Sequence, residues 1–333
     1  SKSIMVLNEA IIRSSRSGKL IQSKVVSRAT IKANAATFHS YQQHGLLQFY
    51  DFQFQTSRYL RDAKLSASHT LRPGEAVIIA HEALLYDEVP DLLTVTIQGK
   101  TLAGKSAEAS ADLRVVNYQS QNTYILPLQG RWFAAAAPSF TGHHRWASVQ
   151  EFAFDFIKIG DGLSTYQHAG EKLTDYYAYN EPIYAVADGV VVSVSDEIEE
   201  TTDNLKRSNE KEEEYFARVG AHQQKLMKKG PQYIYGNHIV VRHANEEYSV
   251  YLHLKPGSIG IKAGDLVKQG QPIARLGHSG NSTEPHLHFH ISNSADLLYS
   301  RSLPITFSNI HLYPDDNGAI RHIHSGQILY TAD

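Results

Sequence analysis

The sequence contains no cysteine, and this absence limits both its chemistry and its means of stabilisation. Disulfides are excluded, and so are thiolate ligands for a metal ion. Histidine and carboxylate side chains are then the only strong zinc ligands that the chain offers. The 18 histidines among 333 residues are a generous supply of such ligands.

Long apolar runs and a strong net charge are also missing. No stretch approaches the roughly 18 apolar residues of a membrane span. The first ten residues, SKSIMVLNEA, lack the apolar stretch of a signal peptide, although a signal removed before Ser1 is compatible with this. The 32 basic side chains nearly balance the 34 acidic ones, so we expect neither a nucleic acid nor an anionic membrane as partner.

The composition is otherwise that of a globular protein long enough for two domains, with 42% hydrophobic residues. The first part of the chain shows short strand patterns separated by turn signals. Leu93, Val95 and Ile97, for example, alternate with polar residues, as in a half-buried strand. We predict a β-sandwich-like accessory domain over residues 1–128, without a catalytic cluster. Its clearest expected strands are 24–33, 46–55, 75–80, 92–99 and 111–118.

Residues 129–333 show a second series of strand patterns and are predicted to form an antiparallel β-sheet domain. The clearest strands are EPIYAVADGVVVSVSD, NHIVVRH, EYSVYLHLKPG and HLHFHI. One charged segment without proline, about residues 201–230, instead favours a helix that ends at Gly230. We predict a mainly β chain with this helical insertion, and we favour a solvated helix on the sheet edge over a functional lid.

The stretch EPHLHFHI places histidines at every second position. In an extended strand His286, His288 and His290 share one face, while Leu287, Phe289 and Ile291 share the other. A polar face of this kind can be an ordinary solvated surface. A regular set of imidazoles opposite a fully apolar face, however, favours a metal site.

Further candidates for such a site lie in other strands. Asp155 in EFAFDFIKI is a lone acid between two phenylalanines, and an ionised carboxylate there requires a partner such as a metal, an arginine or backbone donors. His143 and His144 lie in a turn-like stretch upstream. In YSVYLHL the alternation puts Tyr251 and His253 on one face, opposite Val250, Leu252 and Leu254.

The segments YLHLKPGS and IKAGDLVKQGQPIARLGHSGNSTEPHLHF together resemble the core of the lysostaphin-type, LytM-like zinc endopeptidases, which cleave peptide bonds in bacterial peptidoglycan. The segments EPIYAVADGVVVSV and GNHIVVRH are similar to strands of the same family. The resemblance covers roughly residues 140–295. It implies a small antiparallel β core with a groove over the sheet and one zinc ion per chain.

The resemblance also implies roles for individual residues. His288 and Asp155 correspond to zinc ligands, and His286 and His253 correspond to catalytic histidines beside the metal. The family pattern has its first histidine ligand four positions before the aspartate, where this chain has Glu151. We therefore assign that ligand to His144, with His143 as the alternative.

Other histidines near the motif receive lesser roles. His290 lies about 7 Å along the strand from His288 and is expected to be a groove-wall or hydrogen-bonding residue. His278 in GHSGNS lies in a turn, where we favour a structural role.

The resemblance leads to a hypothesis of function. We expect a zinc metallo-endopeptidase acting on peptidoglycan peptides, located in the periplasm or at the exterior of a bacterium. One alternative is a non-catalytic cell-wall-binding or amidase-activating protein of the same fold. A zinc D,D-carboxypeptidase and a general secreted protease are further alternatives. The bond cleaved, the oligomeric state and the choice between a targeting and an inhibitory role for residues 1–128 stay open.

Overall fold

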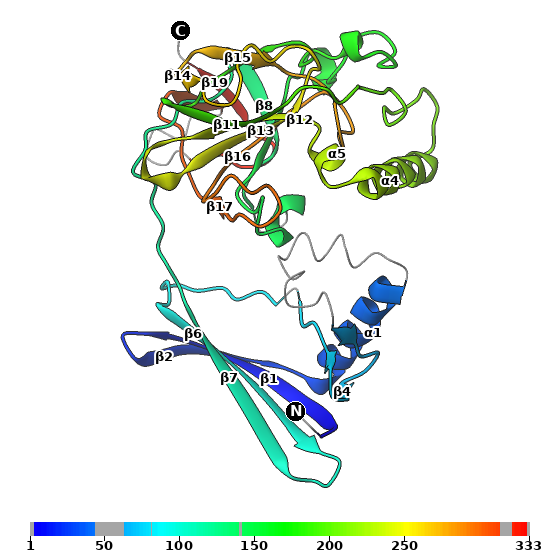
Figure 1. Ribbon diagram of the computed structural model, residues 1–333, viewed down its shortest axis with the longest axis vertical. Helices are drawn as coiled ribbons and strands as arrows, with labels where there is room; N and C mark the ends of the chain where they lie inside the picture. Colours follow the sequence, from blue (N-terminus) through cyan, green and yellow to red (C-terminus); the bar gives the residue numbers. More distant parts are fainter. Residues whose placement is uncertain (1–2, 44–62, 81, 140–141, 314–321, 332–333) are drawn as a thin grey trace. The chain divides into compact units, whose positions relative to one another are not determined.

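The computed structural model describes residues 3–43, 63–80, 82–139, 142–313 and 322–331. The chain divides into two compact units, Ser1–Tyr118 and Gln119–Asp333 (Figure 1). The sequence placed this boundary after residue 128. Tyr124, Leu126 and Leu128, however, are fully buried in the core of the second unit.

The first unit is built on an antiparallel sheet with the strand order β2-β1-β6-β7, and β4 pairs with β1. Helix α1, Arg28–Gln43, and a short parallel pair of strands, β3 with β5, complete it. Its core contains Leu7, Ala10, Val26 and Ile31. The strands are β1 Met5–Arg16, β2 Lys19–Val26, β3 Lys64–Leu65, β4 Thr70–Leu71, β5 Glu75–Ala76, β6 Leu92–Thr101 and β7 Ser106–Arg114.

The β-rich character of this unit is confirmed, but the predicted sandwich is not found among the residues that the structure describes here. The segment 24–33 was predicted as one strand. In the structure β2 ends at Val26, within this segment, and α1 begins at Arg28. Ile31, Ala35 and Phe38 are its buried residues, and this is the spacing of a helix face. The predicted strand at 46–55 lies outside the described residues.

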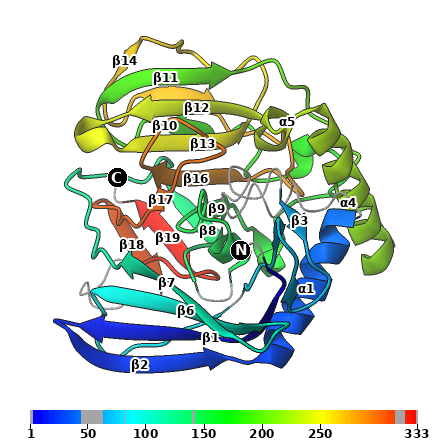
Figure 2. The same ribbon diagram turned by 60° about the horizontal axis from the view of Figure 1, so that its bottom comes forward.

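The second unit is a ten-stranded antiparallel sheet with the order β14-β11-β12-β13-β16-β9-β8-β19-β18, in which β17 pairs with β16 (Figure 2). A separate antiparallel pair is formed by β10 and β15. The strands are β8 Arg131–Ala136, β9 Phe154–Ile157, β10 Pro182–Tyr184, β11 Gly189–Ser195, β12 Asn237–Arg242, β13 Tyr248–Leu254, β14 Leu266–Val267, β15 Pro272–Arg275, β16 Leu287–Ser292, β17 Ser302–Leu303, β18 Ile310–Tyr313 and β19 Ile328–Thr331. Short 3-10 helices occupy η1 His143–Trp146, η2 Asp161–Leu163, η3 Leu173–Asp175 and η4 Ala244–Glu246. The predicted antiparallel β-sheet is therefore confirmed.

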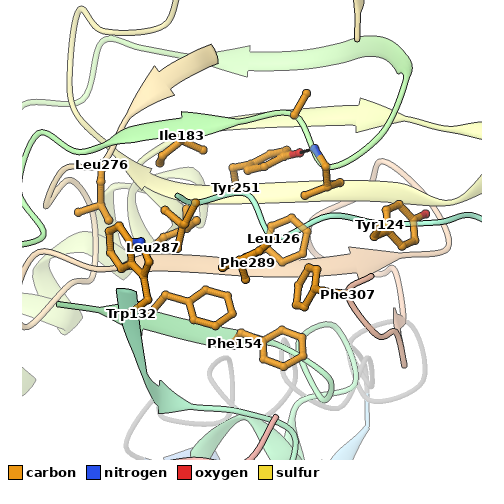
Figure 3. Close-up of a cluster of buried hydrophobic side chains, with 14 of the residues drawn as sticks. Tyr124, Leu126, Trp132, Phe154, Ile183, Tyr251, Leu276, Leu287, Phe289 and Phe307 are labelled. Carbon is orange, nitrogen blue, oxygen red and sulfur yellow. Dashed lines mark hydrogen bonds between the residues drawn. The ribbon is translucent and has the colours of Figure 1, made fainter. Parts of the chain in front are cut away.

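One face of this sheet carries a large aromatic core. Figure 3 shows Phe154, Tyr251 and Phe289 lying together, with Phe307 beside them. The Tyr251 hydroxyl accepts a hydrogen bond from the Val186 backbone N–H at 3.0 Å. This face positions β9, β13 and β16 relative to one another, because each contributes side chains to it.

The predicted insertion lies between β11 and β12, which are neighbours in the sheet. It contains helix α4, Glu212–Lys229, and the short helix α5, Gln232–Tyr235. Gly230 caps α4 with φ of 132°, and acidic residues in the first turn and lysines in the last match the helix dipole. The helix and its end are thus confirmed. None of the helices that the structure describes is long and apolar enough to cross a membrane.

Candidate metal centre

Strand pairing brings Asp155 and His288 together. The antiparallel register of β9 and β16 places the two residues directly opposite each other, so their side chains leave the sheet on the same face. His288 Nδ1 lies 3.0 Å from Asp155 Oδ1. Both residues are buried, with 3% and 8% of their surface exposed. The lone acid of the aromatic strand thus has an imidazole as its partner.

The tandem histidines reach the same carboxylate from η1. His144 Nε2 lies 2.9 Å and His143 Nε2 lies 3.3 Å from Asp155 Oδ2. These two residues and Asp155 form a group whose ligand atoms all lie within 4.8 Å of one another, as a metal ion requires. The His144 side chain is 7% exposed, whereas that of His143 is 67% exposed. The upstream segment therefore returns to the site, as the sequence predicted.

The electrostatics of the cluster favour an ionised Asp155 beside a neutral His288. Burial opposes ionisation of Asp155, but His144 and the hydrogen bonds from His143 and His288 outweigh it and hold the pKa of the carboxyl well below its usual range. Burial lowers the pKa of His288 to about 4. An anionic carboxylate and a neutral imidazole are the forms in which these groups bind a metal.

His286 and His253 adjoin this cluster, and each is held by a backbone carbonyl. His286 Nδ1–H donates to the carbonyl of Glu284 at 2.8 Å, and His253 Nδ1–H donates to that of Ser279 at 2.8 Å. The two ring centroids are 4.7 Å apart, and His286 Nε2 lies 3.8 Å from Asp155 Oδ1. The tautomer fixed in this way leaves each Nε2 without a hydrogen.

His253 reaches the site through an irregularity that the sequence did not reveal. The predicted alternation paired it with Tyr251, but this was wrong, because Tyr251 lies in the aromatic core. Leu252 instead pairs with His288 and shares its face. Leu254 lies in the core, so His253 leaves the sheet on the side of the imidazoles.

The cause is a bulge in β13. Between two pairings, Asn237 with Leu254 and Ile239 with Tyr251, strand β13 contains one residue more than β12. His253 has a backbone φ of 63°, in the left-handed region that few residues other than glycine adopt. The extra residue turns the imidazole from the core face to the site face. Strain of this kind is common where a functional group must be aimed.

His290 and His278 both make hydrogen bonds. His290 Nδ1 lies 3.2 Å from His288 Nε2, so His290 takes the hydrogen-bonding role that the sequence offered it. His278 is 1% exposed, and its ring contacts Ser282 and Asn204. Asn204 was missed, because it lies in the insertion and no pattern around it indicates a site.

The donor set fits a zinc ion. His144, His288 and Asp155 are buried and offer two imidazole nitrogens and a carboxylate oxygen. Two imidazoles and a carboxylate are a common set of protein ligands in catalytic zinc sites. His144 Nδ1 is buried without a hydrogen-bond partner in the described part of the chain, and its Nε2 lies 2.9 Å from Asp155 Oδ2. Nε2 is therefore the atom of this ring that is placed to bind the ion.

Comparison with known proteins points to the same segment of the chain. The family model described as "Peptidase family M23" matches residues 219–298, which include His253, His286 and His288. This match confirms the resemblance inferred from the sequence.

Individual relatives match over short segments. An uncharacterised metalloprotease of Haemophilus influenzae is 42% identical over 77 residues, 22% of this chain and 16% of that protein. The peptidoglycan DD-endopeptidase ShyC of Vibrio cholerae is 46% identical over 54 residues, 16% of this chain and 12% of that protein. The matched segments thus span less than a fifth of these relatives. Among solved structures, the catalytic domain of lysostaphin from Staphylococcus simulans aligns with 19% identity over 52% of this chain and 88% of that chain, with a TM-score of 0.28.

Proposed function

We propose that this chain is a zinc-dependent endopeptidase that hydrolyses peptide bonds of bacterial peptidoglycan. The proposal starts from the match of residues 219–298 to peptidase family M23. The observation that carries the proposal is the meeting of His144, Asp155 and His288 in one buried cluster with two further imidazoles beside it. Similar proteins named as peptidoglycan DD-endopeptidases support the substrate class.

His144, Asp155 and His288 are the proposed ligands of one zinc ion per chain. A zinc ion bound there supplies Lewis acidity that polarises a carbonyl and lowers the pKa of water. His143 is the poorer candidate, since its hydrogen bond to Asp155 raises the pKa of an exposed ring, and a ligand must be neutral.

His253 and His286 are the proposed catalytic histidines. Both present a bare Nε2 on the site face, because their Nδ1–H groups are bound by backbone carbonyls. Burial, with His286 and His288 nearby, holds the pKa of His253 well below its usual value, so its ring is neutral, the form in which a bare Nε2 can act as an acceptor. After accepting a proton, such a ring donates a hydrogen bond to the oxyanion or returns the proton to the leaving amine.

A peptidoglycan substrate would place the protein in the periplasm or at the cell exterior, and this location is part of the proposal. The non-catalytic alternative, a cell-wall-binding or amidase-activating protein, has less support. A non-catalytic protein does not need a complete set of ligands and catalytic histidines, whereas all five residues assigned from the sequence lie together here.

Digestion of purified peptidoglycan tests the proposal. The zinc-loaded protein is incubated with peptidoglycan, and mass spectrometry identifies newly exposed amino termini. The variant His286→Ala serves as the inactive partner. His324→Ala serves as the matched control, because it removes an exposed histidine from the turn before β19. Cleavage by the wild type and His324→Ala alone supports an endopeptidase and names the bond. Binding of zinc and peptidoglycan without new termini would favour the non-catalytic alternative.

A further inference from the structure

The loop between β15 and β16 contains a buried histidine that the proposed reaction does not use. His278 is 1% exposed and belongs neither to the ligands nor to the histidines that face the substrate. Burial lowers its pKa to about 3, so the ring is neutral at ordinary pH. A neutral imidazole carries one hydrogen, and the neighbours of its two nitrogens determine which of them holds it.

Asn204, from the insertion, determines the tautomer of His278. The Asn204 side-chain amide donates through Nδ2 to the carbonyl of Ser282, so its Oδ1 is the atom that faces His278 Nε2, at 3.0 Å. Because Oδ1 can only accept, His278 Nε2 must carry the hydrogen. His278 Nδ1 is therefore bare and needs a donor.

Ser282 supplies that donor and continues the chain to the site. Its Oγ lies 2.8 Å from His278 Nδ1, 2.7 Å from the carbonyl of Glu284 and 3.2 Å from His286 Nδ1. The hydroxyl has a single hydrogen, which lies within reach of both the Glu284 carbonyl and the bare Nδ1 of His278. We assign it to Nδ1, because the contact between His278 and Ser282 otherwise contains no hydrogen. The Glu284 carbonyl and the lone pairs of Ser282 Oγ are then both free to accept from His286 Nδ1–H.

Residues near the start and near the end of the insertion both contact the loop that contains His278. Before α4, Glu200 accepts the backbone N–H of His278 at 2.7 Å. Within α5, the carbonyl of Ile234 accepts the backbone N–H of Asn281 at 2.9 Å. Gly236 packs so closely that an added Cβ would lie 2.4 Å from the carbonyl oxygen of Ser279. Figures 1 and 2 both place α4 and α5 beside the same ends of β12 and β13.

From these contacts we infer that Asn204, His278 and Ser282 are positioning residues for His286, so that the insertion between β11 and β12 is a working part of the site. Asn204 sets the hydrogen on His278, His278 draws the Ser282 hydroxyl towards itself, and the Glu284 carbonyl is left to orient His286. Without the acceptor on His278, the hydroxyl would compete with His286 for that carbonyl. The catalytic part of this inference rests on the proposed function, whereas the hydrogen-bond chain does not.

The hydrogen-bond chain from Asn204 to His286 is tested first, in the metal-free, unmodified protein. Long-range proton–nitrogen NMR of 15N-histidine-labelled protein distinguishes a protonated ring nitrogen from a bare one. The His278 and His286 signals are assigned by their loss in His278→Gln and His286→Ala. We expect the hydrogen on Nε2 of His278 and on Nδ1 of His286. A hydrogen on Nδ1 of His278 would overturn the inference, whatever the protein hydrolyses.

The second test asks whether the effect of Asn204 on His286 depends on the Ser282 hydroxyl. Asn204→Leu keeps the side-chain size and removes the acceptor, so the hydrogen of His278 should move to Nδ1 and kcat should fall on the order of 10- to 100-fold with little change in KM. In a Ser282→Ala background, the same Asn204→Leu change should have almost no further effect, because no hydroxyl relays it.

The control is Tyr179→Phe. It weakens the support of the same loop but leaves the side chains of the hydrogen-bond chain unchanged. Tyr179 donates to Glu200 at 2.7 Å, on the carboxylate that holds the His278 backbone. We expect nearly unchanged kcat and an unchanged His278 tautomer. If Asn204→Leu lowers kcat by the same factor with and without Ser282, the hydrogen-bond chain is wrong. If the wild type hydrolyses nothing yet shows the expected tautomers, the proposed function fails and the hydrogen-bond chain stands.

Discussion

The two faces of β16 are both buried, but by different physical means. Leu287, Phe289 and Ile291 are fully buried in the apolar core, where each large side chain contributes roughly 1.5–3 kcal/mol to folding. His288 and His290 are almost as deeply buried, but they lie against Asp155 and each other. Burying polar groups costs free energy unless each finds a partner. One face therefore stabilises the fold, and the other uses part of that stability to hold imidazoles in place.

This comparison implies that substitutions on the two faces change different measured quantities. A change on the apolar face should alter the free energy of unfolding and leave the site intact in folded molecules. A change on the imidazole face should alter zinc affinity or turnover at similar stability. Adjacent positions of one strand can test this, because successive side chains point to opposite faces.

The largest effect is expected for His288→Ala, on the imidazole face. Removing one of three proposed ligands should reduce zinc content from one ion per chain to almost none and abolish hydrolysis. Zinc is measured by atomic emission after gel filtration, with His324→Ala as control. Stoichiometric zinc in His288→Ala would remove this residue from the ligand set.

On the apolar face, Phe289→Ala should give the next largest effect. Loss of the ring from the core should lower the free energy of unfolding of the second unit by about 3–5 kcal/mol. Both tryptophans of the chain, Trp132 and Trp146, lie in this unit, so their fluorescence during urea titration reports its unfolding. The folded variant should still bind one zinc ion per chain. Loss of zinc at low urea, where the variant is folded, would show that the two faces are not separable.

His286→Ala separates turnover from metal binding. The residue lies just before β16 and is proposed to transfer protons rather than to hold zinc. Its removal should lower kcat by about 10²- to 10⁴-fold while zinc content stays at one ion per chain. Steady-state kinetics on peptidoglycan fragments, with zinc measured on the same sample, test both parts. Wild-type turnover in this variant would exclude His286 from the mechanism.

The face pattern of β16 could be predicted from the sequence, because period-two alternation over six residues leaves little ambiguity. The five assigned residues also lie together in the structure, and their assignment rested on the resemblance of the motifs, since the need of Asp155 for a partner left a metal, an arginine and backbone donors open. The bulge at His253 could not be predicted. A positive φ leaves no mark on a pattern of apolar and polar residues, and regular alternation assigned Tyr251 to the wrong face.

Other parts of the structure were hidden for different reasons. The start of α1 follows β2 after one residue, so its apolar side chains extended the strand pattern of β2 in the sequence. Asn204 contacts the loop of His278 across 74 positions of sequence, and tertiary contacts of this kind have no local signal. Local patterns therefore indicated which side chains share a face of β16, but not where a bulge changes the pattern, as in β13, or that Asn204 contacts the loop of His278.

His290→Phe is expected to have a smaller effect than the preceding changes. The substitution keeps a ring but removes Nδ1, which lies 3.2 Å from His288 Nε2 and would accept its hydrogen when His288 binds zinc through Nδ1. Loss of such a supporting partner should weaken zinc binding by about 10- to 100-fold. His290→Gln retains an acceptor and should recover most of the affinity. Competition with a zinc chelator measures both constants, and equal affinities for the wild type and His290→Phe would limit His290 to packing.

Ile291→Val, one position further along β16, should give the smallest effect. It removes one methylene group from the apolar face and should lower the free energy of unfolding by about 0.5–1.5 kcal/mol. Because Ile291 points away from the imidazoles, the zinc dissociation constant and kcat should equal those of the wild type. The pair Ile291→Val and His290→Phe therefore compares the two faces at neighbouring residues, by urea titration of the metal-free proteins and by chelator competition. If Ile291→Val weakened zinc binding as much as His290→Phe, packing in the core would set the ligand geometry, and stability and metal binding would be properties of one rigid strand rather than of its separate faces.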